Sequence, residues 1–271
     1  MNSLKKIALF YVFANVHVAL ATGAMTYVTL FKYGEMDAVP VFFVFLSTIV
    51  SYNFIRLVRL ETIQSWMAVW LDKNRKLMLV LSGICGLFLL VLLSQLRWEA
   101  IGTLIPFFIV TFFYSVPFFY TKRSLRFTPG IKLFLIAFSW AGVTVFFPLV
   151  DAEYTVNVEI LVVFIQRVFL VMALTIPFDI RDLNYDASHL KTIPQLIGVK
   201  KSKLLGVFFA LVFMGIEFYY CQFKMDLMLP ELMVGVLLIL GLCFSNRNQN
   251  KWFASFWIEA IPIVWLLLLL I

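Results

Sequence analysis

Nine long apolar runs, separated by short polar segments, constrain this chain more than any other feature of its sequence. Most of them are close to the roughly 20 residues that a helix needs to cross a lipid bilayer. They span residues 7–31, 39–60, 77–96, 101–120, 131–150, 160–178, 204–221, 227–244 and 253–271. Open β-strands cannot cross lipid because their backbone groups would stay unpaired. The pattern therefore predicts an all-α membrane protein with nine transmembrane helices in a single polytopic domain, residues 1–271.

The composition supports this interpretation. Hydrophobic residues make up 63% of the chain and charged residues 14%, whereas a soluble domain has about 45–50% and about 25%. The net charge of +7 does not indicate nucleic-acid binding, because the basic residues lie in short loops and form no continuous surface. We expect membrane lipid around the helices and no nucleic acid as a partner.

The distribution of Lys and Arg predicts the orientation. If the N-terminus is cytoplasmic, eighteen of the 22 basic residues fall on the cytoplasmic side, and three, Lys32, Arg97 and Lys224, fall outside. This asymmetry obeys the positive-inside rule. Residues 5–21 also resemble a signal peptide, but the apolar run continues well past the possible cleavage point. We expect a multi-pass protein with a cytoplasmic N-terminus, located in the inner membrane of a bacterial cell.

Three aspartates at the cytoplasmic end of the sixth run are the most informative polar group. Asp179, Asp182 and Asp186 have the i, i+3, i+7 spacing that places side chains on one helical face. Such a cluster needs cations to offset its repulsion, and Mg²⁺ binds one or two carboxylates together with phosphate oxygens. Lys191 and three further lysines follow closely. The residues alone are equally compatible with a magnesium–diphosphate site and with a polar loop of mixed charge.

Two motifs favour the first interpretation. Residues 181–186 read R-D-L-N-Y-D and are followed by K-T-I-P at 191–194 and I-G-V-K at 197–200. This segment resembles the second aspartate-rich motif of the UbiA superfamily of intramembrane prenyltransferases. Residues 114–117, Y-S-V-P, together with Lys122 and Arg123, are similar to that superfamily's Tyr-x-x-Pro…Lys-Arg stretch. The specific motifs cover about 50 residues, and the nine-helix plan covers the whole chain.

The resemblance implies transfer of a prenyl group from an allylic diphosphate to a lipophilic acceptor, with magnesium as cofactor. It implies that Asp182 and Asp186 hold the metal, with Asp179 in support. It further implies that Lys122, Arg123 and Lys191 contact the diphosphate.

The superfamily's first aspartate-rich motif, N-D-x-x-D-x-x-x-D, is largely lost. Its counterpart at residues 53–61 reads N-F-I-R-L-V-R-L-E, so Asn53 and the final acid, Glu61, remain. We expect Asn53 and Glu61 to complete the opposite wall, with Glu61 as a further metal ligand. Arg56 is a candidate for direct contact with the diphosphate, because guanidinium pairs well with phosphate oxygens. The alternative is that Arg56 anchors the helix at the membrane surface.

Three functional hypotheses stay open. The first is an active prenyltransferase with an altered metal site, which the retained second motif favours. The second is a catalytically inactive relative that binds an isoprenoid or a partner protein, which the lost first motif favours. The third is a small transporter or membrane assembly factor whose carboxylates relay protons.

Ionisable groups within the apolar runs are further functional candidates. His17 could orient an acceptor or act as a base, or it could form a hydrogen bond between helices. Arg167 lies about 18 Å from Asp179 along a regular helix, too far for contact. We expect Arg167 to pair with Glu217 or Glu259.

Overall fold

The computed structural model describes residues 3–58, 65–115, 130–184, 191–220 and 225–271. Asp186, Glu61, Lys122 and Arg123 lie outside these ranges. The described chain is entirely helical, and its elements are α1 Ser3–Phe13, α2 Val16–Lys32, α3 Val39–Val58, α4 Ser65–Leu93, α5 Trp98–Ser115, α6 Ile131–Asp151, α7 Val158–Asp182, α8 Ile193–Tyr220, α9 Met225–Phe244, the π-helix η4 Phe253–Ile258, and α10 Ile261–Leu269.

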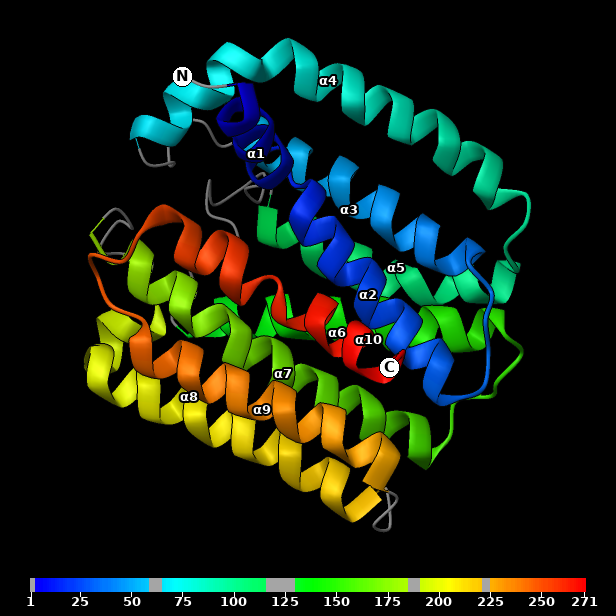
Figure 1. Ribbon diagram of the computed structural model, residues 1–271. Helices are drawn as coiled ribbons and strands as arrows, with labels where there is room; N and C mark the ends of the chain where they lie inside the picture. Colours follow the sequence, from blue (N-terminus) through cyan, green and yellow to red (C-terminus); the bar gives the residue numbers. More distant parts are fainter. Residues whose placement is uncertain (1–2, 59–64, 116–129, 185–190, 221–224) are drawn as a thin grey trace.

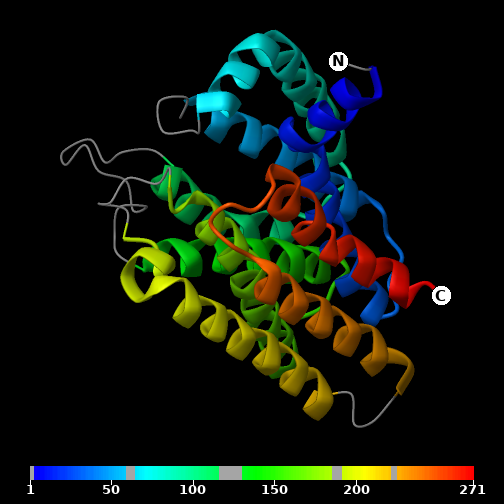
Figure 2. The same ribbon diagram turned by 60° about the vertical axis from the view of Figure 1, so that its left-hand side comes forward.

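The helices run side by side between two ends of the molecule (Figure 1). The C-terminal ends of α3 and α7 lie at one end, together with the N-terminal ends of α4 and α8 (Figure 1). The α2–α3, α4–α5 and α6–α7 connections lie at the other end (Figure 1). Seen after a 60° turn, α4 and the α8–α9 pair occupy opposite sides, with α2, α6 and α10 between them (Figure 2).

Several helices have the length and hydropathy expected of a membrane span. Within the described residues, four meet both criteria, and the bent pair α1 and α2 makes a fifth candidate. Shorter apolar helices occupy residues 98–113, 228–244 and 253–269. Only 11% of the most apolar stretch of α4, within residues 67–93, is buried. Because that surface is apolar, α4 is suited to face lipid. The prediction of a multi-pass membrane protein is confirmed, and the number of nine spans stays a prediction.

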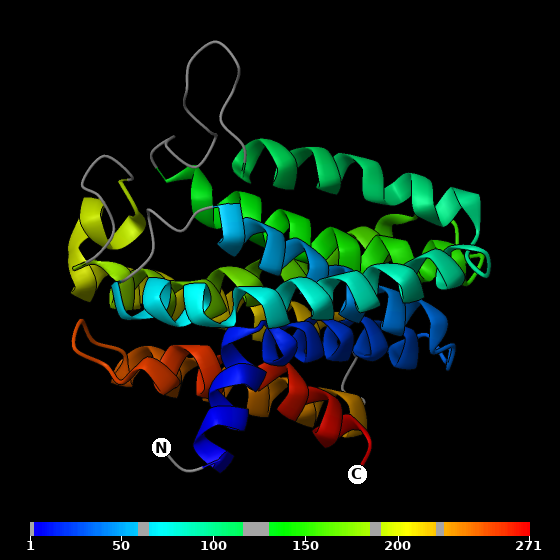
Figure 3. The same ribbon diagram turned by 90° about the horizontal axis from the view of Figure 1, so that it is seen from above.

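The first apolar run is broken rather than continuous. Asn15 adopts a left-handed conformation with φ 66°, and the axes of α1 and α2 differ in direction by 53°. Asn is among the residues that tolerate this conformation best. The break turns α1 out of line with α2 (Figure 3). Phe10 and Phe13 of α1 contact Trp70 near the N-terminal end of α4.

The largest apolar core joins α2, α6, α7, α8, α9 and α10. Trp265 of α10 is 1% exposed and packs edge-on against Phe213 of α8. Between α5 and α6, the ring of Phe107 lies directly over Gly142, where an added Cβ would come within 2.0 Å of the ring. Small residues let membrane helices approach closely in this way.

Candidate functional site

The break between α1 and α2 brings polar side chains into the bundle. Asn15 donates from Nδ2 to Oδ1 of Asn53 on α3 at 2.7 Å, and Asn53 donates to Oγ of Ser82 on α4 at 3.1 Å. Asn53 is completely buried. Its amide group therefore links three helices, a role that the sequence did not indicate.

Arg56 lies one turn beyond Asn53 on α3. Its NH1 donates at 2.7 Å to the carbonyl oxygen of Phe13, the last residue of α1. The final carbonyls of a helix have no partner within that helix, so Arg56 satisfies one of them. Arg56 also lies close enough to Asp182, Glu259 and Arg181 for their charges to interact.

The aspartates of α7 are paired with basic side chains. Arg181 contacts both carboxylate oxygens of Asp182, from Nε at 2.8 Å and NH2 at 3.0 Å. Its NH1 donates to Oγ of Ser255 in η4 at 2.7 Å. Asp179 is 1% exposed, and its Oδ1 accepts from Nζ of Lys132 at 2.5 Å. The acids were thus identified from the sequence, but Lys132 of α6 as the partner of Asp179, and Ser255 of η4 as a partner of Arg181, were not.

The C-terminal segment supplies a further acid. Glu259 directly follows the π-helix η4, and its charge interacts with those of Arg56 and Arg181. His17 holds the same segment, because its Nε2 lies 2.9 Å from the carbonyl oxygen of Phe256. The His17 ring also stacks on the Phe256 ring. π-Helical turns often occur at functional sites, and this one brings Glu259 to the arginines.

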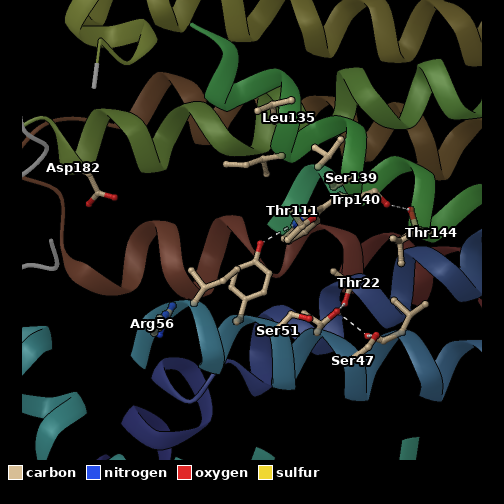
Figure 4. A pocket seen from close by; sticks show the side chains of 17 residues that line it. Thr22, Ser47, Ser51, Arg56, Thr111, Leu135, Ser139, Trp140, Thr144 and Asp182 are labelled. Atoms are coloured by element: carbon tan, nitrogen blue, oxygen red, sulfur yellow. Dashed lines mark hydrogen bonds between the residues drawn. The ribbon is translucent and has the colours of Figure 1, made fainter. Parts of the chain in front are cut away.

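A cavity of about 380 Å³ extends from this charged end into the bundle. Side chains of α2, α3, α5 and α6 line it, together with Asp182 of α7. Figure 4 shows Arg56 and Asp182 at one end, while Thr22, Ser47 and Thr144 lie farther along. Phe54 and Leu57, which replace the missing aspartates, do not line this cavity, and Phe54 is 54% exposed.

The predicted site residues are therefore only partly brought together. Arg56 and Asp182 share the cavity, whereas Asn53 is enclosed behind it in hydrogen bonds to two helices. Lys191 is exposed, with φ 45°. Asp186, Glu61, Lys122 and Arg123 lie outside the described residues, so their predicted roles stay predictions.

A complete magnesium site does not follow from the described residues. No group of three or more His, Cys, Asp or Glu side chains able to hold a metal occurs among them. Of the four predicted ligands, the two that are described, Asp182 and Asp179, both pair with basic groups. The donor set on the described part of the chain therefore does not fit magnesium by itself.

A second polar network joins α2, α7, α8 and α9, and none of its charged side chains lines the cavity. Lys32 at the end of α2 contacts Glu217 at 2.7 Å and Glu231 at 2.9 Å, and both acids are at most 1% exposed. Gln166 donates to the other Glu217 oxygen at 2.6 Å. The charge of Arg167 interacts with those of Glu231 and Glu217. Arg167 thus has Glu217 rather than Glu259 nearby, and Glu231 is a neighbour that the sequence did not suggest.

Arg167 also connects this network to the cavity. It is 2% exposed, and its NH1 donates to the Met25 carbonyl oxygen and to Oγ1 of Thr144, which lines the cavity. Its guanidinium lies over the Trp265 ring, 4.8 Å from the centroid. These contacts all lie in the protein interior, which suits a role for Arg167 in helix packing.

Comparisons with known proteins identify the fold. No protein-family model matches the sequence, and no curated protein matches it. The structure is similar to a solved structure of a digeranylgeranylglyceryl phosphate synthase of membranes, with a TM-score of 0.55 and 17% sequence identity. The match covers 98% of this chain and 97% of that one. The chain therefore has the fold of that synthase, in agreement with the UbiA-like fold that the sequence resemblance implied.

Proposed function

We propose that this protein is a UbiA-like prenyltransferase, which transfers a prenyl group from an allylic diphosphate to a lipophilic acceptor. One observation carries the proposal. In a fold shared with a digeranylgeranylglyceryl phosphate synthase, a cavity between the helices ends at Arg56 and Asp182. Ligand sites are usually clefts with apolar walls and a few polar groups that fix the ligand's orientation. The apolar side chains of this cavity would suit a prenyl chain, and Arg56 at its end would suit a charged head.

The departing diphosphate determines what the charged end must do. As the allylic carbon–oxygen bond breaks, negative charge develops on the diphosphate, and cationic groups that face it lower the barrier. We propose that Arg56 meets this charge directly, and that Lys122, Arg123 and Lys191 contribute from the flanking loops. Asn53 would act indirectly, because it fixes α3 and hence the position of Arg56.

Magnesium belongs to the proposal through Asp182, Asp186, Asp179 and Glu61. In the described structure, Arg181 pairs with Asp182. Asp182 would therefore be able to hold a metal only if Arg181 released it.

We propose nine membrane spans with a cytoplasmic N-terminus. The alternation of helix ends in Figure 1 supports this count when α1 with α2 and η4 with α10 each form one span. In this orientation Arg56, Arg181 and Asp182 lie at the cytoplasmic end, where a soluble diphosphate would enter.

A non-catalytic isoprenoid-binding protein is the second candidate. The pairing of Asp179 and Asp182 with Lys132 and Arg181 favours it, because those carboxylates are already neutralised. The position of Phe54 argues against it, since this side chain does not fill the cavity.

Binding of geranylgeranyl diphosphate to the purified protein in lipid nanodiscs tests the proposal. The titration is made with and without magnesium, on the native chain and on Asp182→Asn, with Asp72→Asn on the exposed surface of α4 as the matched control. We expect magnesium-dependent binding that Asp182→Asn weakens at least about tenfold and Asp72→Asn leaves unchanged. An affinity for geranylgeranyl diphosphate that changes neither with magnesium nor in Asp182→Asn would favour the non-catalytic candidate. No binding by folded protein would refute both.

A further inference from the structure

The α8–α9 pair lies at one edge of the bundle and has an apolar outward face (Figure 2). On α8, Leu204, Phe208 and Leu211 follow one another at helical spacing and are 70%, 56% and 53% exposed. On α9, Leu240 and Phe244 are 47% and 69% exposed. Because lipid tails are as apolar as these side chains, the face is suited to contact the hydrocarbon of a bilayer.

Three exposed cations lie at one end of this face. The helices α8 and α9 run antiparallel (Figure 1), and Nζ of Lys203 donates to the Cys243 carbonyl oxygen at 2.8 Å, which fixes their register. Residues just before Lys203 on α8 therefore lie level with residues just after Cys243. Lys200 and Lys201 precede this contact, Arg247 follows it, and all three are exposed. The apolar face thus ends in a basic cluster formed by Lys200, Lys201 and Arg247.

No neighbouring acid in the described structure balances this basic cluster. Within residues 191–220 and 228–252 the only acids are Glu217 and Glu231, and both belong to the buried network around Lys32. Asp179 and Asp182 of α7 lie at the same end of the molecule, but each is paired with a basic side chain. The cluster therefore presents a net positive charge beside an apolar surface.

We propose that the apolar face of α8 and α9 binds an anionic phospholipid, with its headgroup at Lys200, Lys201 and Arg247 and its acyl chains along the face. Lys and Arg clusters beside membrane helices attract anionic lipids, and both side chains bind phosphate oxygens. A soluble anion would use only the basic cluster, whereas a lipid uses both parts of the surface. The site is separate from the proposed prenyl transfer, because none of these residues lines the cavity.

The helix α4 offers a matched comparison. Lys73, Arg75 and Lys76 are exposed near its N-terminal end, at the same end of the molecule, and an exposed apolar stretch follows them. Asp72 is exposed directly beside them. It lies four residues before Lys76, the spacing at which opposite charges attract on a helix. Because this acid offsets part of the charge, we expect α4 to be the weaker of the two surfaces for an anionic lipid.

Native mass spectrometry of the purified protein tests the proposal. The protein in detergent is equilibrated with equal amounts of dioleoylphosphatidylglycerol and dioleoylphosphatidylcholine, which share their acyl chains and differ in net charge. We expect the native chain to retain the anionic lipid at least about fivefold more than the zwitterionic one. The combined variant Lys200→Gln, Lys201→Gln, Arg247→Gln should retain the two lipids within about twofold of each other. Replacing the three α4 cations by Gln removes the same charge and should leave the preference intact.

Circular dichroism of both triple variants should match that of the native chain, because all six side chains are exposed. Four outcomes would overturn the proposal. Equal retention of the two lipids by the native chain would show that no anionic-lipid site exists. A preference that survives in the α8–α9 variant would place the site elsewhere, and an equal loss in both variants would show an effect of net charge alone. Displacement of the lipid by millimolar inorganic phosphate, but not by chloride at the same ionic strength, would indicate a site for soluble phosphate.

Discussion

The buried network around Lys32 yields a quantitative prediction about stability. Lys32 contacts two carboxylates, of Glu217 and Glu231, and Arg167 completes a group of four charges that sum to zero. Lys32→Met leaves this group with a net negative charge inside the bundle. We therefore expect the substitution to be strongly destabilising.

The magnitude follows from the distances. At 2.7 and 2.9 Å and an effective dielectric constant of about 20, each contact contributes about 6 kcal/mol of Coulomb energy. Desolvation of the three groups offsets most of this energy, and removal of one partner from a buried ion pair costs about 3–5 kcal/mol. Because unfolding free energies are about 5–15 kcal/mol, Lys32→Met should remove a large fraction of the stability.

Charge balance predicts which second substitution restores stability. Lys32→Met with Glu231→Gln returns the sum to zero and leaves Glu217 with Gln166 and Arg167 as neighbours, so we expect most of the loss to be recovered. The assay is unfolding by sodium dodecyl sulfate in mixed micelles, followed by circular dichroism. Lys201→Met, at an exposed position of α8, is the control. A loss below about 1 kcal/mol for Lys32→Met, or a double variant as unstable as the single one, would show that charge balance does not govern this network.

Three further predictions concern helix packing and the charged end. Asn53→Ala breaks the link from Asn15 to α4 and should lower the unfolding free energy by about 1–3 kcal/mol in the same assay; an unchanged value would show that the link is unimportant. Gly142→Val drives a side chain into the Phe107 ring and should lower the unfolding free energy by about 1–3 kcal/mol. Phe107→Ala should make room for the new side chain and recover part of this loss. If the losses of the two single variants simply add in the double variant, the contact is contradicted. Arg56→Gln should weaken geranylgeranyl diphosphate binding about tenfold while circular dichroism stays native, and unaltered affinity would remove Arg56 from the diphosphate site.

Helix positions could be predicted from the sequence because length and hydropathy are local properties of each run. The interruption of the first run, where Asn15 adopts a left-handed conformation, was not predicted. Neither was the π-helical turn η4 in the last run. The presence of Asn15 and His17 within an apolar run was the available signal for the first of these, and no comparable signal marks the second.

The candidate site was predictable only in part, because the local spacing of residues does not reveal which residues from distant parts of the chain will pair. The spacing of Asp179 and Asp182 was visible, but Lys132 lies 47 residues from Asp179. Lys32 was assigned to an outer loop, and the structure instead has it 12% exposed between two buried acids. Such partners emerge only when the helices are packed.

The proposed function requires that the charged end of the cavity bind a prenyl diphosphate. An electron cryo-microscopy structure of the protein in nanodiscs with geranylgeranyl thiodiphosphate, an unreactive analogue, would show this binding directly. We expect density for the two phosphates beside Arg56 and Asp182, with the prenyl chain entering the cavity between α3 and α6. Phosphate density elsewhere on the protein, or a prenyl chain bound outside this cavity, would contradict the proposal.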